Sequence, residues 1–360
     1  MKLPKALFVL GLLMGCAAGP SAAAEGRPAV PDGAEVATAP EPGNPGGAGA
    51  LGSMQLPTMG TTDGASEQPM TAPMEIMPAE SASLSEVAPG VYRLDLGARA
   101  LEVDVSQGAR VLSFGLDGRN VLRPLDRSSG FLNGGSTLWT SPQSDWSWPP
   151  LPAHDERPYV PTPEGAALSA AGEAADLAGT RIGITKRFSA DRARDAIQIE
   201  YKLRNEGGAP ATLAPWEVSR HPTSGLTFWP GSASRGDFAL EQRGAHLWLS
   251  YDALWAGDDG KVFADASAGW LAHLQDDLLV VRSWQDVPAA MQAPEEAEVE
   301  VYLAATYIEL EAQGPYDVIA PGASAAWSVR WYVVPVPAGT DVAVGSAALI
   351  DLVLRTIADP

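Results

Sequence analysis

After about residue 86 the chain consists of short runs in which apolar and polar residues alternate, and this period of two constrains the fold most strongly. Examples are TRIGITKRFSA at 180–190, DAIQIEYKLRN at 195–205 and AAWSVRWYVVPV at 325–336. Gly, Asp and Pro stand between such runs, as they do at turns between strands. Only Ala343–Ile357 is typical of a helix. The pattern predicts an all-β domain with a short C-terminal helix.

The change in composition along the chain predicts its division into parts. We place the β domain at 86–340, which is long enough for two large packed sheets, and a helical tail at 341–360. Residues 16–85 are rich in Ala, Gly, Pro and Ser and contain no aromatic residue. Such a segment buries too little apolar surface to offset its conformational entropy, so we predict a disordered tether there. Residues 1–15 form a candidate signal peptide.

The N-terminus has the layout of a secretion signal, with two lysines before an apolar run at 6–15 that is too short to span a bilayer. The tetrad LMGC at 13–16 resembles the lipobox of bacterial lipoproteins, which implies a lipid on Cys16. The alternative is an ordinary signal peptide cut after the alanines at 22–24. Ala17 is not the aspartate that retains lipoproteins at the inner membrane. By this resemblance we expect a lipid-anchored cell-envelope protein, at the outer membrane.

Charge and motif content exclude several classes of function. The chain has 24 Lys and Arg against 44 Asp and Glu, a net charge of −20. A nucleic-acid partner is therefore not expected, since phosphate binding needs a basic face, and membrane contact would come only through the lipid. The single cysteine is Cys16, so we expect neither a disulfide nor a cysteine metal site. No zinc, calcium or nucleotide motif is present, and we predict no cofactor and no metal.

A tryptophan-rich loop is the first candidate binding element. Asn133-Gly134-Gly135 permits a tight turn or a close backbone approach and leads into Ser136–Pro150, which contains Trp139, Trp146 and Trp148. Flat indole rings can stack on the apolar face of a sugar. Side chains able to bond sugar hydroxyls are interspersed there: Asn133, Ser136, Thr137, Gln143 and Asp145. The alternative is that the tryptophans fill the core, with Trp139 inside and the other two nearer the surface.

Two strands present acidic and imidazole groups. In the run at 214–221, alternation puts one set of side chains on one strand face: Glu217, Ser219 and His221. The other face receives Trp216, Val218 and Arg220. In the run at 307–313, Tyr307, Glu309 and Glu311 share a face. Neighbouring carboxylates raise one another's pKa, and a neutral imidazole exchanges protons near pH 7, so both sets suit acid–base chemistry. The alternatives are solvated strand faces.

The order of these motifs resembles the galactose-mutarotase-like superfamily of aldose 1-epimerases over roughly residues 86–340. The motifs that carry the resemblance are GARVLSFGLDGRNVL (108–122), NGGSTLWTSP (133–142), WPP (148–150), PWEVSRHP (215–222), YIELE (307–311) and WSVRWYVV (327–334). The resemblance implies a β-supersandwich of two large antiparallel sheets with a sugar-sized groove on one concave face. It further implies Glu311 as the base at the anomeric hydroxyl, Glu309 as a second candidate, and His221 as the acid at the ring oxygen.

The predicted sugar-contacting residues surround these three. They are Asn133, Trp139, Gln143, Asp145, Trp146, Trp148, Glu217 and Arg220. The chain departs from the enzymes of the superfamily at Asn133, where they carry arginine, and after His221, where Pro222-Thr223 replace an aromatic residue. These departures bear more on catalysis than on sugar binding.

Three functions therefore follow from the sequence. The first is a lipid-anchored cell-envelope protein that binds carbohydrate. The second is a mutarotase or epimerase acting on an extracytoplasmic sugar through Glu/His acid–base catalysis. The third is a structural or assembly lipoprotein that binds protein partners, since fold alone does not fix function. The pattern predicts no particular oligomeric state.

Overall fold

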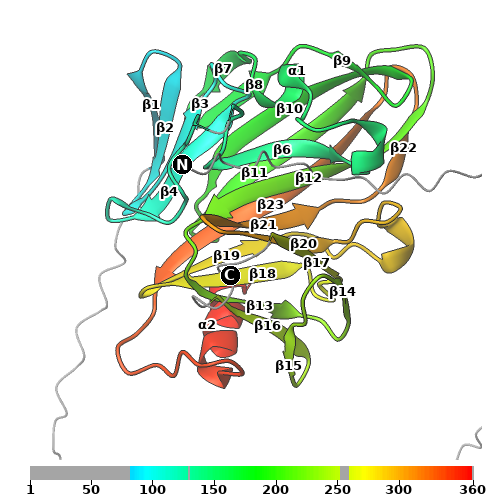
Figure 1. The fold of residues 1–360 in the computed structure, drawn as a ribbon. Coiled ribbons are helices and arrows are strands. Elements are labelled where there is room, and N and C mark those ends of the chain that lie inside the picture. Colours follow the sequence, from blue (N-terminus) through cyan, green and yellow to red (C-terminus); the bar gives the residue numbers. More distant parts are fainter. Residues whose placement is uncertain (1–81, 129, 252–258, 359–360) are drawn as a thin grey trace, which may run out of the picture. The chain divides into compact units, whose positions relative to one another are not determined.

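The computed structural model describes residues 82–128, 130–251 and 259–358 (Figure 1). Cys16, the predicted signal peptide and the predicted tether up to residue 81 lie outside the described residues. Strand β1 (Ala82–Ala88) pairs in antiparallel fashion with β2 (Val91–Leu96). Residues 82–85, which their composition places in the tether, are therefore part of a strand, because pairing with β2 satisfies their backbone groups.

The first sheet has twelve strands within the described residues, in the order β1-β2-β3-β4-β6-β12-β21-β20-β17-β14, with β5 beside β4 and β22 beside β12. Its other strands are β3 (Arg99–Asp104), β4 (Arg110–Leu116), β5 (Arg119–Asn120), β6 (Ser136–Ser141), β12 (Ala211–His221), β14 (Ser234–Gly236), β17 (Gly260–Ala264), β20 (Val299–Ala304), β21 (Tyr307–Gln313) and β22 (Asp317–Ile319). Strands distant in sequence, such as β6, β12 and β21, thus become direct neighbours.

The second sheet has eleven strands within the same residues, in the order β15-β16-β13-β18-β19-β23-β11-β10-β8-β7, with β9 beside β10. They are β7 (Val160–Glu164), β8 (Ala167–Ala171), β9 (Ala175–Leu177), β10 (Thr180–Asp191), β11 (Ala196–Asn205), β13 (Gly225–Pro230), β15 (Glu241–Arg243), β16 (His246–Tyr251), β18 (Trp270–Gln275), β19 (Leu278–Ser283) and β23 (Ser324–Pro335). The prediction of an all-β sandwich of two large antiparallel sheets is confirmed.

The hydrophobic core lies between the sheets. Phe114 of β4 meets Trp331 of β23 edge to face, with ring centroids 5.3 Å apart, and both side chains are fully buried. Leu101 of β3 and Ile199 of β11 are equally enclosed. Each such side chain contributes roughly 1.5–3 kcal/mol through burial. The alternating sequence folds this way because one face of many strands is apolar, as with Ile308 and Leu310 of β21.

Hydrogen bonds establish which face of β12 points into this core. Glu217 accepts hydrogen bonds from Tyr201 of β11 and Trp331 of β23, two strands of the second sheet. Alternation then directs Ser219 and His221 inward as well. The opposite side of the first sheet, called the outer face below, carries the other residues of this stretch: Trp216, Val218 and Arg220.

Helices are few and short among the described residues. They are the 3₁₀ turns η1 (Gln143–Asp145) and η3 (Ala289–Met291), and the helices α1 (Pro152–Asp155) and α2 (Ala347–Ile357). The predicted C-terminal helix is confirmed as α2, which starts where the Ser346 hydroxyl accepts from the Leu349 amide at 3.2 Å. Its Leu349 and Val353 are fully buried. In the described ranges, no helix has the length and apolar character needed to cross a membrane.

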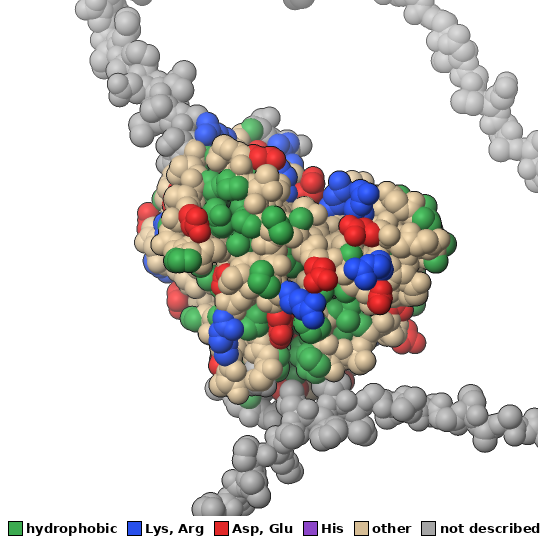
Figure 2. All heavy atoms as spheres, turned by 90° about the horizontal axis from the view of Figure 1, so that it is seen from above, with side chains coloured by type: hydrophobic (Ala, Val, Ile, Leu, Met, Phe, Trp, Pro, Cys, Tyr) green, Lys and Arg blue, Asp and Glu red, His purple; other side chains and the backbone are tan. Residues whose placement is uncertain are grey.

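Surface charge is mixed on the side of the molecule that Figure 2 views. Acidic and basic side chains are interspersed there among uncharged ones, and neither sign forms a continuous patch. A face of this kind has no single-signed field that would select a polyanion. Recognition on it would depend on local geometry rather than on net charge.

Lys186 of β10 is a buried cation inside the sandwich. Its Nζ donates to the carbonyl of Gly108 at 2.6 Å, and burial, with a further contribution from Arg110, lowers its pKa from 10.5 to about 7. Asp155 and Glu217 oppose this shift. The folded protein therefore releases this proton near neutrality, whereas the unfolded chain holds it to about pH 10.

This difference predicts a pH-dependent stability. Between about pH 7 and 10 the unfolded chain binds the extra proton, so the free energy of unfolding should rise with pH, by up to about 1.4 kcal/mol per unit from Lys186. Urea denaturation of the wild type and Lys186→Met across this range measures the effect. We expect the variant to lose that part of the slope. Equal slopes for the two proteins would refute the assignment.

Candidate functional site

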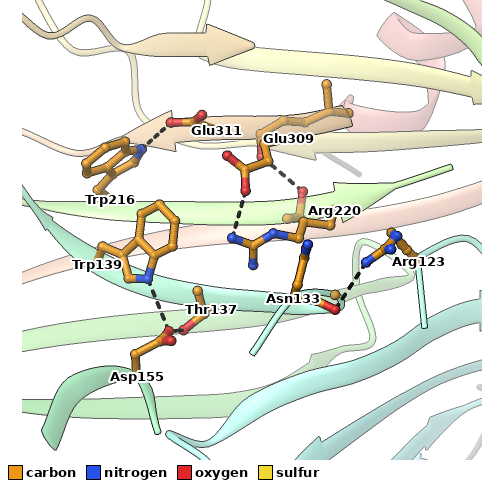
Figure 3. A network of polar contacts seen from close by, with 12 residues as sticks. Arg123, Asn133, Thr137, Trp139, Asp155, Trp216, Arg220, Glu309 and Glu311 are labelled. Atoms are coloured by element: carbon orange, nitrogen blue, oxygen red, sulfur yellow. Dashed lines mark hydrogen bonds and ion pairs between the residues drawn. The ribbon is translucent and has the colours of Figure 1, made fainter. Parts of the chain in front are cut away.

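Strands β6, β12, β21, β20 and β17 are neighbours at the centre of the first sheet. Their register sets Trp216 beside Trp139 and Arg220 beside Glu309. Partners in an antiparallel register point to the same side, so these side chains meet on the outer face. Figure 3 shows Arg220 and Glu309 turned toward each other, with the two tryptophans alongside.

Arg220 and Glu309 form the central ion pair of the outer face. Nη2 of Arg220 lies 2.7 Å from Oε1 of Glu309, and the arginine is 0 % exposed. Its guanidinium carbon lies 5.4 Å from the ring centroid of Trp139 and 5.8 Å from that of Tyr307. Its Nε and Nη1 have no hydrogen-bond partner among the described residues, whereas Nη2 is engaged by Glu309. Buried donors are normally satisfied, so this arginine retains capacity for a ligand.

A second charged cluster lies next to it. Nζ of Lys261 is 3.0 Å from Oε2 of Glu311 and 2.5 Å from Oε2 of Glu300, and it lies 4.6 Å from the ring centroid of Trp216. The indole of Trp216 donates to Oε2 of Glu311 at 2.7 Å. Burial raises the pKa of Glu311 and of Glu300, and Lys261 opposes both shifts. Two carboxylates share one ammonium, which favours retention of a proton within the cluster.

Asp155, the last residue of α1, anchors the tryptophan side of the face. Its Oδ1 accepts from Thr137 at 2.8 Å and from the indole of Trp139 at 3.1 Å (Figure 3). It also accepts from Nη2 of Arg110 at 2.7 Å. Because Arg110 and the hydrogen bonds favour the charged form, the pKa of Asp155 is lowered despite the opposing effect of burial. The carboxylate therefore fixes the orientation of the Trp139 ring.

The predicted tryptophan-rich loop at Ser136–Pro150 is in part a strand, because Ser136–Ser141 pair with β12 as the buried strand β6, and only the residues after it form the loop. The three tryptophans of this stretch differ in burial. Trp139 is buried, Trp146 is half-buried with its indole donating to the carbonyl of Thr140 at 2.8 Å, and Trp148 is 42 % exposed. Their rings touch, at 5.6 Å between the centroids of Trp139 and Trp148 and 5.9 Å between Trp139 and Trp146. The loop therefore both fills space over the outer face and leaves one ring open to solvent.

The two glycines before the loop allow a close backbone approach. Gly134 and Gly135 have φ values of +135° and +62°, and a Cβ on Gly135 would lie 2.1 Å from the carbonyl oxygen of Val111. Nη1 of Arg123 donates to the carbonyl of Asn133 at 3.2 Å. Oδ1 of Asn133 is buried without a partner among the described residues. The predicted close approach thus places an unsatisfied amide oxygen near the outer face.

Gln143 and Asp145, also predicted to contact a sugar, belong to η1. The backbone N–H of Gln143 donates to Oε1 of Glu296 at 2.9 Å, and Asp145 is exposed. In the described residues neither makes a hydrogen bond or ion pair with Arg220 or Glu309.

The structure does not bring His221 and Glu311 together. His221 points into the core, where its Nδ1 lies 2.9 Å from the carbonyl of Val121 and its Nε2 lies 2.9 Å from Nη2 of Arg282. Its ring centroid is 4.9 Å from that of His273, and burial lowers the pKa of His221 well below 6.5. The predicted acid–base pair of His221 and Glu311 is therefore not formed, because the two side chains point to opposite faces of the first sheet.

Glu217 requires the same correction. Oε2 of this carboxylate accepts from the Tyr201 hydroxyl at 2.6 Å, Oε1 accepts from the Trp331 indole at 3.1 Å, and Nε of Arg282 lies 3.6 Å from Oε1. All four side chains are fully buried between the sheets. Glu217 therefore belongs to the core network and not to the outer face.

Sequence reasoning missed several residues of the outer face. They are Arg110, Asp155, Trp216, Lys261 and Glu300. Trp216 was visible as the strand neighbour of Arg220 on the same face. Arg110, Lys261 and Glu300 reach the site through the arrangement of different strands in the sheet, and Asp155 reaches it from α1. Alternation within one strand does not reveal either. In the described ranges no group of three or more His, Cys, Asp or Glu side chains is arranged to hold a metal ion.

Comparison with known proteins assigns the chain to a family. Residues 91–334 match the family described as a domain of unknown function, DUF4380. The chain belongs to the DUF4380 family. The match covers the strands that carry the site, from β2 to β23. No curated protein matches this DUF4380 chain significantly.

Solved structures share the fold of this DUF4380 protein. The Slr1438 protein from Synechocystis sp. PCC 6803 is 14 % identical, with a TM-score of 0.50 over 71 % of this chain and 98 % of that one. A galactose mutarotase-like protein from Lactobacillus casei ATCC 334 is 11 % identical, with a TM-score of 0.48 over 68 % and 100 %. Galactose 1-epimerase from Lactobacillus acidophilus NCFM is 12 % identical, with a TM-score of 0.45 over 72 % and 100 %. At such identities a likeness concerns the fold.

Proposed function

We propose that this protein binds a neutral carbohydrate on the outer face of β6, β12 and β21. Sugars combine apolar C–H faces with many hydroxyl groups, and a sugar site needs aromatic rings beside a few well-placed polar groups. The outer face has both, in Trp139, Trp148, Arg220, Glu309 and the amide oxygen of Asn133. Its cations are matched by carboxylates, so the face suits an uncharged ligand.

The observation that carries the proposal is the state of Arg220. It is enclosed, lies between two aromatic rings and has unused donors, which makes it a preorganised group for sugar oxygens. Glu309, at 7 % exposure, is the less enclosed carboxylate, whereas Glu311 at 0 % is occupied by Lys261 and Trp216. We therefore assign ligand contact to Arg220 and Glu309, whereas Glu311 holds the Trp216 ring through its indole N–H.

Binding without Glu/His epimerisation fits this arrangement better than the epimerase alternative. All four histidines of the chain are among the described residues, at 154, 221, 246 and 273. None of them makes a hydrogen bond or ion pair with Arg220, Glu309 or Glu311. The face therefore has carboxylates but lacks the imidazole acid that the epimerase mechanism requires.

Trp148→Ala is the first test of the binding proposal. A glycan array followed by calorimetry on the best ligand should show roughly tenfold weaker binding for the variant, because stacking on the exposed ring is lost. The matched control is Leu354→Ala, which removes a comparably exposed apolar side chain from α2.

Four outcomes separate the candidate functions. Weakening by Trp148→Ala but not by Leu354→Ala supports the site. Equal affinity for both variants would move the ligand away from this loop, and no glycan binding at all would favour the protein-partner alternative. NMR of freshly dissolved glucose and galactose with the same samples should show no faster anomer exchange than buffer, and acceleration would restore the epimerase alternative.

A further inference from the structure

A cavity of about 320 Å³ opens beside the tryptophan loop, away from the ion pair described above. It is formed by the segment between β5 and β6, the turn after β3 and the residue that follows α1. Its lining residues are Gln107, Arg127, Gly130, Phe131, Leu132 and Glu156. The volume falls within the range of roughly 300–1,000 Å³ typical of small-molecule sites. No group assigned so far to the carbohydrate site lines it.

A row of aromatic rings connects this cavity to Arg220. The ring of Phe131, which lines the cavity, lies 5.3 Å from that of Trp148, and Trp148 lies 5.6 Å from Trp139. Trp139 in turn lies against the guanidinium of Arg220. Exposed Trp148 therefore stands between the two places, and a ligand stacked on it could extend into both.

The backbone provides a second connection. Glu156 lines the cavity and directly follows Asp155, whose carboxylate holds the indole of Trp139. The Gly108 amide, next to Gln107, donates to the carbonyl of Arg157 at 2.9 Å. The cavity wall is thus attached to the same elements that orient the outer-face site.

The lining suits a polyhydroxylated, uncharged group. A guanidinium nitrogen of Arg127 contacts the amide oxygen of Gln107, and both side chains can also bond hydroxyls. Glu156 adds an exposed carboxylate, so the one cation is balanced by one anion. The ring of Phe131 supplies an apolar surface. The cavity thus resembles the outer face in placing aromatic carbon near one cation and one anion.

We infer that this cavity is a second sugar subsite, and that the protein binds an oligosaccharide chain rather than a single monosaccharide. The inference rests on the proposed function, since the first sugar unit occupies the Arg220–Glu309 site. The chain passes over Trp148, and a following unit enters the cavity between Arg127, Phe131 and Glu156.

A length series tests this inference. The probes are oligomers of one to four units of α-1,4-linked glucose, β-1,4-linked galactose and β-1,4-linked N-acetylglucosamine, titrated calorimetrically against the full protein. For the series that binds, we expect affinity to rise at least about tenfold from the monomer to the tetramer. Arg127→Ala/Glu156→Ala should remove most of this gain and leave the monomer affinity unchanged. Both side chains are exposed, and the rings of Trp148 and Trp139 lie between the cavity and Arg220.

The matched control is Arg181→Ala/Asp176→Ala, which removes an exposed ion pair of β9 and β10 in the second sheet. It should retain the full gain with length. Monomer binding that depends on Arg220, with no gain for longer oligomers, would overturn the inference and leave the proposed function standing. A gain that the Arg127/Glu156 variant retains would overturn the subsite. Failure of every probe to bind would overturn the inference together with the proposed function.

Discussion

Arg220→Met should abolish measurable carbohydrate binding, with a loss of about 100-fold or more. The guanidinium would contribute at least two charge-assisted hydrogen bonds to a ligand, each worth roughly 1.5–3 kcal/mol. Methionine keeps the length and apolar contact of the side chain but donates no hydrogen bond. Calorimetry on the best glycan of the array measures the loss.

Arg220→Met should also destabilise the fold, so the experiment has to distinguish a loss of stability from a loss of binding. It leaves Glu309 almost enclosed without its cation, and breaking a buried pair from one side costs about 3–5 kcal/mol. Replacing both partners, as in Arg220→Met/Glu309→Met, should recover most of this stability, since two packed apolar side chains need no counterion. A double variant that folds well but does not bind supports the site, and one that binds like wild type excludes it.

Glu217→Leu should destabilise the fold to a similar extent, but with little change in affinity for sugar. It removes the acceptor of Tyr201 and Trp331 and leaves the buried Arg282 without its carboxylate. We expect the free energy of unfolding to fall by about 3–5 kcal/mol in urea denaturation. Glu217→Gln should fall by less, because the amide oxygen still accepts hydrogen bonds.

The pair of experiments uses two residues three positions apart on one strand. They lie on opposite faces of β12, so a difference in sugar binding between the two variants would follow from the alternation of that strand. The glycan affinity of folded Glu217→Gln should match that of wild type. A selective loss of affinity in this variant, at unchanged stability, would return Glu217 to the binding site.

Local pattern was sufficient to predict the all-β class, the hairpins and the C-terminal helix, but not strand β6, whose residues Ser136–Ser141 were assigned to a loop. The turn at Asp117-Gly118 is one case: both residues have positive φ, at +51° and +77°, and the strands β4 and β5 flank them as expected. The helix near the C-terminus is another. The start of the domain was harder to predict from the sequence. Residues of β1 have the composition of the tether and form a strand only through pairing with β2.

For the site, the sequence led to β12 and β21 but to an incorrect combination of their residues. Alternation within the run at 214–221 already separates Arg220 from His221, and alternation within 307–313 groups Glu309 with Glu311. It does not tell which face of the first run meets which face of the second. The superfamily resemblance paired His221 with Glu311, whereas the register of β12 and β21 pairs Arg220 with Glu309.

The sequence by itself determined the all-β class, the hairpins, the C-terminal helix and the strands that carry chemical groups. It did so because hydrophobic period and turn residues act over a few positions. Only the tertiary structure decided which charged side chains point into the core between the sheets and which lie on the outer face. That decision depends on contacts between strands such as β6, β12, β17 and β21, more than 40 residues apart in several cases, whose register is fixed by packing between two sheets.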